Sequence, residues 1–434
     1  MTIEYLKKAE KTAATGEDDT AKIVRRMLEE IEQGGEAKAR EYALTLDGWD
    51  KEIILAPAEI EAAIAEVPEQ TKQDIRFSHA RVKAFAEAQL ASMTEFGTEL
   101  SPGLFAGQRL IPVNTAGCYI PGGRYAHIAS AIMSVTTAKV AGVKHVVACS
   151  PTHKDRGVHP AIIYAANLAG ADTILSLGGV QGVAALAFGL FTGHPADILV
   201  GPGNRFVAEA KRILYGRVGI DLFAGPTEVA IICDDSADPE LVACDLASQC
   251  EHGLDSPAWM ISLSRGVAEK SIELMPKYID RLAEPNRSTA RSSWADYGEV
   301  VVVDTREEAV EVSDGYASEH LEVHCGDLDW WLTNLTNYGS LFLGEETTVS
   351  YGDKCSGTNH ILPTKGAARY TGGLSVSKFI KVLTWQRMTR ESNREVGAVT
   401  ARISRSEGME GHARSGDDRL YKYFPGEEFD LGIE

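Results

Sequence analysis

The sequence lacks the features that mark secreted and membrane proteins. Its seven cysteines are odd in number and include no CxxC pair. No apolar run approaches the roughly 20 residues that a membrane-spanning helix needs. The opening stretch, MTIEYLKKAEKT, is charged and has no apolar segment of the signal-peptide kind. We therefore expect a reduced, cytoplasmic protein that has no part in a membrane.

Positive charge is also scarce. The 43 Lys and Arg residues against 62 Asp and Glu residues give a formal net charge of −19. This excess of acid disfavours nucleic acid or an acidic membrane surface as a partner. The chain does contain 44% hydrophobic residues and 41 glycines among its 434 residues. That composition is typical of a globular enzyme with two or more domains.

The apolar pattern changes along the chain. Residues 1–93 predict helices with short breaks. From about residue 107, short apolar runs that end in Gly or Pro alternate with Ala-rich helical stretches, which predicts an α/β fold with a parallel sheet. Ligands of such sheets bind at the carboxyl ends of the strands. The runs after residue 228 suggest a second α/β unit, and the strand-poor segment beyond about residue 366 predicts a small helical appendage.

The stretch SQCEHGLDS, residues 248–256, places an amide and an imidazole at an expected helix end. Gln249 and His252 are three residues apart and share a helix face, and Gly253 favours a stop. The pair fits half of a metal site or a capped helix with a satisfied histidine. Cys250 and, further on, Cys355 are rival ligands or nucleophiles, although small core residues are the commoner case.

Three glycine turns and three acid–histidine pairs are the other candidates. The turns carry Tyr119, Gln181 and Asn204, and they fit either phosphate binding at helix N-termini or purely structural turns, since none is a complete GxGxxG motif. The pairs are Glu319 with His320, Asp353 with His360, and Glu407 with His412. Gln249, His252, Asp353 and His412 form a nitrogen and oxygen set suited to zinc, but spacing alone does not bring them together.

Taken together, the motifs resemble those of the histidinol dehydrogenase family. The sequence contains seven motifs in the same order as the family: YIPGG, GGVQGVAALAFG, GPGNRFVAEAKR, AGPTEV, SQCEHGLDS, EHLEV and SGTNHILPT. The match runs from about residue 20 to about residue 415. The resemblance implies a zinc-dependent, NAD-linked homodimer that oxidises a primary alcohol through an aldehyde to a carboxylate in two hydride transfers. It also implies an α/β fold of two incomplete Rossmann-like domains with a helical N-terminal region and a C-terminal tail that reaches into the partner subunit.

The resemblance also implies domain boundaries. Residues 1–24 would form the N-terminal helical segment. Residues 25–118 with 227–365 would form the first Rossmann-like domain, which carries the metal and acid/base residues. Residues 119–226 would form the second, with the NAD contacts, and residues 366–434 would form the tail.

Position by position, the resemblance gives the candidate residues roles. The implied zinc ligands are Gln249, His252, Asp353 and, from the other chain, His412. His320 would take the alcohol proton, and Glu319 would activate the water that attacks the aldehyde. The implied NAD contacts are Tyr119, Gln181 and Asn204, and the implied substrate contacts are Thr227, His360 and Glu407. Thr227 stands where the family usually has Ser.

The sequence departs from the family around the substrate. Val349 replaces a usual glutamate, Lys354 a usual tyrosine, and Arg124 and His127 stand in a loop that is usually neutral. A pocket that loses a carboxylate and gains cations favours an anion over an ammonium group.

The tail resembles a paralogous branch that includes sulfopropanediol 3-dehydrogenase. We therefore expect a small anionic diol, 2,3-dihydroxypropane-1-sulfonate, as substrate, with histidinol as the alternative. A metal-dependent hydrolase and a non-catalytic binding protein are the other classes considered.

Overall fold

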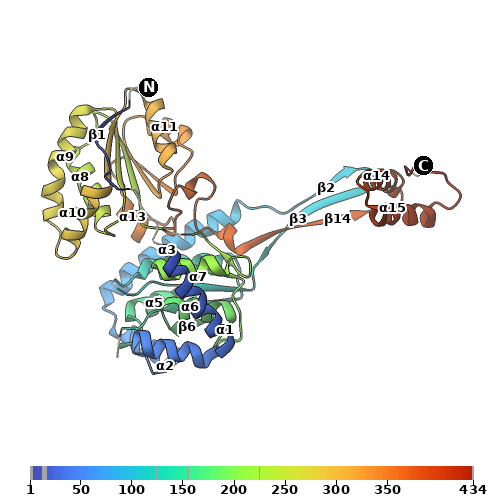
Figure 1. Cartoon of the computed structure of the whole chain (residues 1–434), viewed down its shortest axis with the longest axis horizontal. Coiled ribbons are helices and arrows are strands. Elements are labelled where there is room, and N and C mark those ends of the chain that lie inside the picture. Colours follow the sequence, from blue (N-terminus) through green and yellow to red (C-terminus); the bar gives the residue numbers. More distant parts are fainter. Residues whose placement is uncertain (1–2, 12–16, 124, 154–155, 224, 433–434) are drawn as a thin grey trace. The chain divides into compact units, whose positions relative to one another are not determined.

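The computed structural model describes residues 3–11, 17–123, 125–153, 156–223 and 225–432 (Figure 1). Contacts between residues divide the chain into two compact units. The large unit comprises Met1–Leu90 and Val113–Phe379, and the small unit comprises Ala91–Pro112 and Ile380–Glu434. None of the helices in the described part of the chain is long and apolar enough to cross a membrane.

The large unit contains a five-stranded parallel sheet with the order β6-β5-β4-β7-β8. Its strands are β4 (Thr115–Tyr119), β5 (His145–Ser150), β6 (Thr173–Ser176), β7 (Ile198–Val200) and β8 (Gly219–Ile220). The connecting helices are α4 (Ile128–Val140), α5 (Pro160–Ala169), α6 (Gly179–Phe188) and α7 (Arg205–Leu214). Most of the residues in these strands are buried, as expected for a parallel sheet covered on both faces.

A six-stranded sheet, with the order β1-β11-β10-β9-β12-β13, forms the other half of the large unit. Its strands are β1 (Glu4–Lys7), β9 (Val229–Cys233), β10 (Ala258–Ser262), β11 (Gly298–Val302), β12 (His320–His324) and β13 (Ser340–Leu343). The accompanying helices are α8 (Pro239–Cys250), α9 (Arg265–Asp280), α10 (Asn286–Tyr297), α11 (Arg306–Tyr316), α12 (Leu328–Asn334) and α13 (Val349–Lys354). Helices α8, α9 and α10 cover one face, and α11 covers the other.

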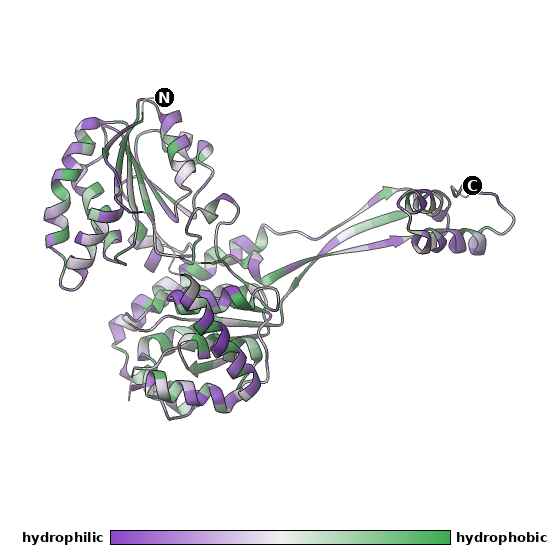
Figure 2. Cartoon of the chain, in the orientation of Figure 1, coloured by the Kyte–Doolittle hydropathy of each residue, from purple (hydrophilic) through white to green (hydrophobic). Residues whose placement is uncertain are grey.

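The five parallel strands of each sheet follow the same order. Numbered within its own sheet, each set runs 3-2-1-4-5, which is the Rossmann order without its sixth strand. The prediction of an α/β fold with two incomplete Rossmann-like sheets is therefore confirmed. Figure 2 shows that the strands of both sheets are mostly hydrophobic and that hydrophilic residues lie along the outer faces of the surrounding helices.

The N-terminal region differs in one element from the helices that the sequence predicts. Residues Glu4–Lys7 form strand β1, which pairs antiparallel with β11, because the edge of the sheet offers backbone partners that an isolated short helix would not find. Helices α1 (Glu17–Asp47), α2 (Pro57–Glu66) and α3 (Glu69–Ala91) follow as expected. The buried face of α1 packs on α6 and α7.

The small unit combines a three-stranded antiparallel sheet with a helical hairpin. Its elements are β2 (Phe96–Ser101), β3 (Leu104–Pro112), β14 (Ile380–Met388), α14 (Asn393–Ser406) and α15 (Glu410–Tyr423). The sequence predicts only helices beyond residue 366, but β14 pairs with β3 along its whole length. Because its side chains are mostly exposed, β14 lacks the apolar alternation that reveals a half-buried strand.

Candidate active site

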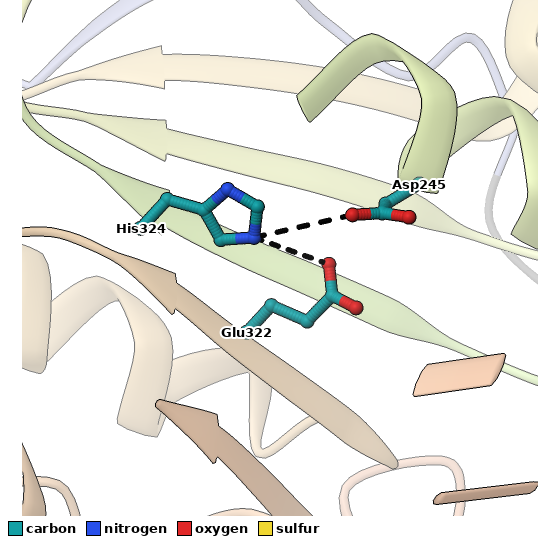
Figure 3. A group of neighbouring side chains, drawn as sticks. All are labelled: Asp245, Glu322 and His324. Atoms are coloured by element: carbon teal, nitrogen blue, oxygen red, sulfur yellow. Dashed lines mark ion pairs between the residues drawn. The ribbon is translucent and has the colours of Figure 1, made fainter. Parts of the chain in front are cut away.

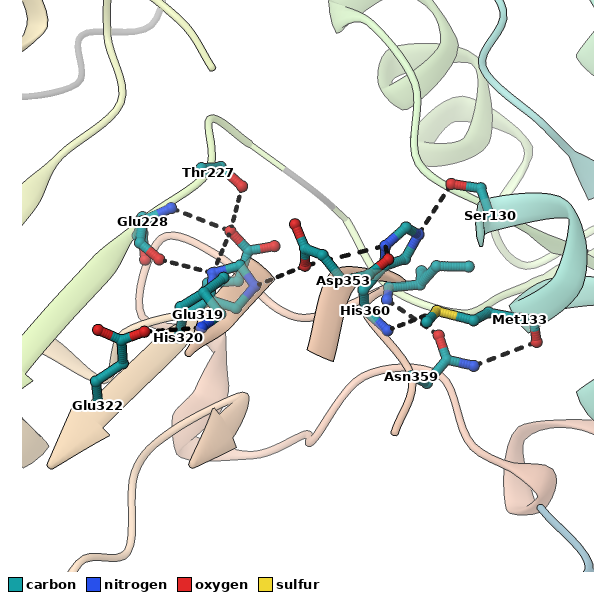
Figure 4. Close-up of polar contacts among 12 residues, drawn as sticks. Ser130, Met133, Thr227, Glu228, Glu319, His320, Glu322, Asp353, Asn359 and His360 are labelled. Carbon is teal, nitrogen blue, oxygen red and sulfur yellow. Dashed lines mark hydrogen bonds and ion pairs between the residues drawn. The ribbon is translucent and has the colours of Figure 1, made fainter. Parts of the chain in front are cut away.

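Glu319 and His320 lie at the amino end of β12, and backbone and side-chain contacts fix both (Figure 4). Thr227 Oγ1 donates a hydrogen bond of 2.7 Å to Glu319 Oε2, and the Glu228 amide donates one of 3.0 Å to the same oxygen. His320 Nδ1 lies 3.0 Å from the Glu228 carbonyl oxygen. A carbonyl only accepts, so Nδ1 carries a proton, and Nε2 is the nitrogen at which His320 gains or loses its second proton.

Asp353, on α13, faces this base. Its Oδ1 lies 3.6 Å from His320 Nε2. Burial lowers the pKa of His320, but the charges of Glu319 and Asp353 outweigh it and raise the pKa to about 9. Burial works against ionisation of Asp353, yet its contact with His320 holds the pKa of that carboxyl well below its usual range. Burial raises the pKa of Glu319. The three groups therefore interact strongly enough to shift one another's pKa values, as candidate proton-transfer groups do.

His360 joins the segment after α13 to α4 from the other sheet. Its Nδ1 lies 3.1 Å from the Asp353 carbonyl oxygen and therefore donates, so Nε2 accepts the hydrogen bond of 2.9 Å from Ser130 Oγ. Burial lowers the pKa of His360 to about 4, which keeps the ring neutral near pH 7. This bridge brings the predicted residues Asp353 and His360 together with Glu319 and His320. Their direct contact with substrate stays a prediction.

The end of α8 supplies two of the predicted zinc ligands. Gln249 is 2% exposed, and its Oε1 has no hydrogen-bond partner among the described residues. The His252 side chain is exposed. Desolvation lowers the pKa of its imidazole below the usual value, and the nearby charge of Asp353 opposes that shift only in part. An orphaned amide oxygen and an imidazole beside a carboxylate are donors suited to zinc. By donor chemistry, these residues and Asp353 suit three of the four predicted ligand positions, and their binding of zinc stays a prediction.

The fourth predicted ligand lies in the small unit. His412 is exposed in the first turn of α15, and the predicted substrate residue Glu407 is exposed at the end of α14. Their roles stay predictions.

The cations expected near the substrate have different surroundings. Lys354 is exposed at the end of α13. His127 immediately precedes α4, and burial lowers the pKa of its imidazole, with the charges of Lys354 and His252 acting in the same direction. Arg124 lies outside the described residues. Val349 begins α13 with its side chain in the hydrophobic core, so it offers no carboxylate.

The predicted NAD residues all lie at carboxyl ends of the five-stranded sheet. Tyr119 Oη accepts a hydrogen bond of 3.1 Å from the Gly179 amide. Gln181 donates to Asp47 at 2.8 Å, while its Oε1 has no partner among the described residues. Asn204 caps α7 by accepting from the amides of residues 206 and 207. Unpartnered buried oxygens at the same sheet edge belong to Ser150, Thr152 and Ser176. Such an edge fits a ligand rich in hydrogen-bonding groups, as NAD is.

Two features of the site are missed by the sequence analysis. Glu228 holds both members of the acid/base pair through its backbone, and only its place in AGPTEV hints at this. Asp245, Glu322 and His324 come together as the only group of three His, Cys, Asp or Glu residues in the described chain with ligand atoms all within 4.8 Å of one another. The alternate acidic and basic residues in EHLEVH are its only signal. Cys250 is fully buried and burial raises its pKa to about 12, so it is a core residue and no nucleophile.

The fold and the site together define an α/β protein with two incomplete Rossmann-like sheets and a buried candidate acid/base pair at the amino end of β12. The family model described as histidinol dehydrogenase matches residues 10–420. The chain therefore belongs to the histidinol dehydrogenase family.

Individual relatives span nearly the whole chain. Sulfopropanediol 3-dehydrogenase of Ruegeria pomeroyi is 60% identical over 431 residues, which are 99% of this chain and 99% of that protein. Histidinol dehydrogenase of Methanothermobacter thermautotrophicus is 38% identical over 404 residues, covering 93% and 94% of the two chains. The crystal structure of histidinol dehydrogenase from Elizabethkingia anophelis matches with a TM-score of 0.89 at 31% identity and 95% coverage of both chains.

Proposed function

We propose that this protein is a zinc-dependent, NAD-linked dehydrogenase that oxidises 2,3-dihydroxypropane-1-sulfonate through the aldehyde to 3-sulfolactate. The observation that carries the reaction class is the buried arrangement of Glu319, His320 and Asp353, in which each side chain is held by a neighbour. The alcohol step delivers one hydride to one NAD and releases one proton. The aldehyde step consumes one water, delivers the second hydride to a second NAD and releases two protons as the carboxylate forms. One substrate molecule therefore yields two NADH.

The chain's residues divide the proton transfers between them. Gln249, His252 and Asp353, with His412, would hold zinc, which when bound polarises the substrate oxygen. His320, once deprotonated at Nε2, accepts the alcohol proton there, because the Glu228 carbonyl occupies Nδ1. Glu319 uses Oε2 for Thr227 and Glu228, so Oε1 is the oxygen that takes a proton from the attacking water.

The substrate proposal rests on charge. Lys354, the residue after Asp353, lines a cavity of about 660 Å³ together with Asp74 and with Ile128 at the start of α4. Val349 supplies no carboxylate for an ammonium group. The high identity to a sulfopropanediol dehydrogenase over 99% of both chains supports the same choice. Histidinol is the second candidate, because a histidinol dehydrogenase shares the fold and 38% of the aligned residues.

A screen for NADH formation with the sulfonate, histidinol and a neutral diol tests this proposal. We expect kcat/KM for the sulfonate to exceed that for histidinol by about a hundredfold, or roughly 3 kcal/mol. Lys354→Ala should raise KM for the sulfonate about tenfold and leave the neutral diol unchanged, since the contact is remote from the reacting carbon. Lys144→Ala, which removes an exposed lysine before β5, is the matched control. Efficient histidinol turnover without sulfonate turnover would reject the substrate.

We further propose a homodimer in which His412 completes the metal site of the partner subunit. The exposed position of His412 on the small unit leaves its ring available for this role. Mixing His412→Ala chains with His320→Ala chains should restore part of the activity, because one site of each mixed dimer then has both histidines. Unmixed variants are the controls, and subunit exchange without recovery would show that sites are not shared.

A further inference from the structure

Three side chains of the types that bind metal ions, Asp245, Glu322 and His324, converge near the acid/base pair without being part of it (Figure 3). Glu322 and His324 are alternate residues of β12, so they point to the same face of the sheet. Helix α8 covers that face and brings Asp245 to them. His324 Nε2 lies 3.8 Å from Glu322 Oε2 and 4.0 Å from Asp245 Oδ2.

Each carboxylate is oriented by a neighbour that occupies only one of its oxygens. The Val349 amide donates to Glu322 Oε1 at 2.7 Å, and Thr348 Oγ1 donates to Asp245 Oδ1 at 3.1 Å. The other oxygens, Oε2 and Oδ2, face His324 Nε2. Hydrogen bonds that fix one side of a ligand and leave the other side free are typical of metal sites.

Two of the three inward-facing atoms are buried without a hydrogen-bond partner in the described part of the chain. Glu322 Oε2 and His324 Nε2 are both buried and unpartnered among the described residues, and their side chains are 0% and 1% exposed. Leaving two carboxylates and an imidazole in a dry interior without a counterion costs several kcal/mol. The 18% exposure of the Asp245 side chain leaves a route by which an ion and a water ligand can enter.

We propose that Asp245, Glu322 and His324 bind a divalent transition-metal ion, with zinc the best match, at a second site distinct from the Gln249, His252 and Asp353 set. One nitrogen and two carboxylate oxygens suit zinc, with water as the fourth ligand. Tetrahedral ligands with bonds near 2.0 Å lie about 3.3 Å apart. The spacings of 3.8 and 4.0 Å to His324 Nε2 exceed this value by about 0.5 and 0.7 Å, and the ligand atoms of the two carboxylates lie within 4.8 Å of each other, so binding requires the side chains to close by up to about 1.5 Å.

The ion would have a structural role. Its ligands come from β12 and α8, and the residues that orient them lie at the start of α13. The same three elements carry His320, Gln249 and Asp353. Binding would therefore fix the distances among the elements of the active site. The competing explanation is a proton shared by the two acids, because burial raises the pKa of both Glu322 and Asp245.

Metal counting on the full-length protein separates these explanations. The protein is stripped with chelator, dialysed against zinc, and measured by mass spectrometry of the metal. We expect about two ions per chain in the wild type, and about one in His324→Gln and in His252→Ala. The control His194→Gln, at an exposed histidine outside both sites, should leave the count unchanged. Glu322→Gln should repeat the loss seen in His324→Gln, with folding checked by circular dichroism.

The outcomes also separate this site from the proposed catalytic zinc. One ion that is lost in His324→Gln but kept in His252→Ala would support the second site and reject the catalytic one. One ion that is lost only in His252→Ala would overturn the second site. Should His324→Gln fail to fold, titration of stripped wild type with Co²⁺ decides. Two absorbing sites support the proposal, and a single site that is abolished in His252→Ala overturns it.

Discussion

The two parallel sheets of the large unit share one strand order but carry their candidate residues at opposite ends. In the five-stranded sheet, Tyr119 ends β4, and Asn204 follows β7, so the predicted NAD contacts lie at carboxyl ends. In the six-stranded sheet, Glu319 immediately precedes β12 and Glu228 immediately precedes β9, so the acid/base pair lies at amino ends. The predicted residues therefore follow the rule that ligands bind at carboxyl ends in only one of the two sheets.

The buried polar groups of the two sheets differ in kind. Asp221, beside the five-stranded sheet, is fully buried and satisfied by Lys211 and the Gly201 amide, and the unpartnered oxygens there are neutral hydroxyls and an amide. Beside the six-stranded sheet, the unpartnered atoms include those of ionisable groups, among them Glu228 and His320, as well as the neutral groups of Gln249, Ser313 and Ser318. Neutral groups can receive a ligand's hydrogen bonds, whereas ionisable groups can hold protons or metal. The difference matches a division into cofactor binding and chemistry.

The largest effect should come from the ionisable pair at the amino end of β12. His320→Asn should slow both alcohol and aldehyde oxidation by roughly 10²- to 10⁴-fold, the usual worth of general acid–base catalysis. Glu319→Gln should slow aldehyde oxidation by a similar factor and spare alcohol oxidation, because only the second step needs an activated water. Single-turnover NADH formation from alcohol and from aldehyde measures the two steps separately. Equal losses in both steps with Glu319→Gln would contradict the separate roles.

The sequence predicts this pair but not its surroundings. Glu319 and His320 are neighbours in the chain, so their proximity needs no tertiary information, and the strand and helix alternation is local too. Asp245 and His324 are separated by 79 positions and meet only because α8 folds back on β12. Strand β14 is missed because it depends on pairing with β3, which precedes it in the sequence by all of residues 113–379. Local periodicity therefore predicts elements, while sites built between elements need the fold.

Glu228 tests whether the ionisable groups cost stability. Burial raises its pKa from 4.5 to about 7, so the folded state resists its ionisation. Stability should therefore fall as the pH rises from 4.5 to 7 and then level off, since above pH 7 both states are ionised. Glu228→Gln should remove this loss and raise the free energy of unfolding at pH 8 by an amount on the order of 3 kcal/mol, with no gain near pH 4.5.

Urea unfolding at both pH values measures the effect. Exposed Glu61→Gln, on α2, is the control and should change neither value. A pH-independent gain in Glu228→Gln would mean that its charge is not the source of the cost.

The smallest expected effect separates the two roles of Asn204 in the five-stranded sheet. Its Oδ1 accepts from the Phe206 amide at 3.0 Å and from the Val207 amide at 3.2 Å, so it caps α7. Asn204→Ala should therefore lower the free energy of unfolding by about 1 kcal/mol. Asn204→Asp keeps the cap and the stability, but its charge opposes a cofactor pyrophosphate at the helix N-terminus. KM for NAD should rise about tenfold, or roughly 1.4 kcal/mol.

Thr305→Asp makes the matching change at the cap of α11 beside the other sheet and should leave KM unchanged. If Asn204→Asp binds NAD as the wild type does, Asn204 is a helix cap alone and the cofactor lies elsewhere.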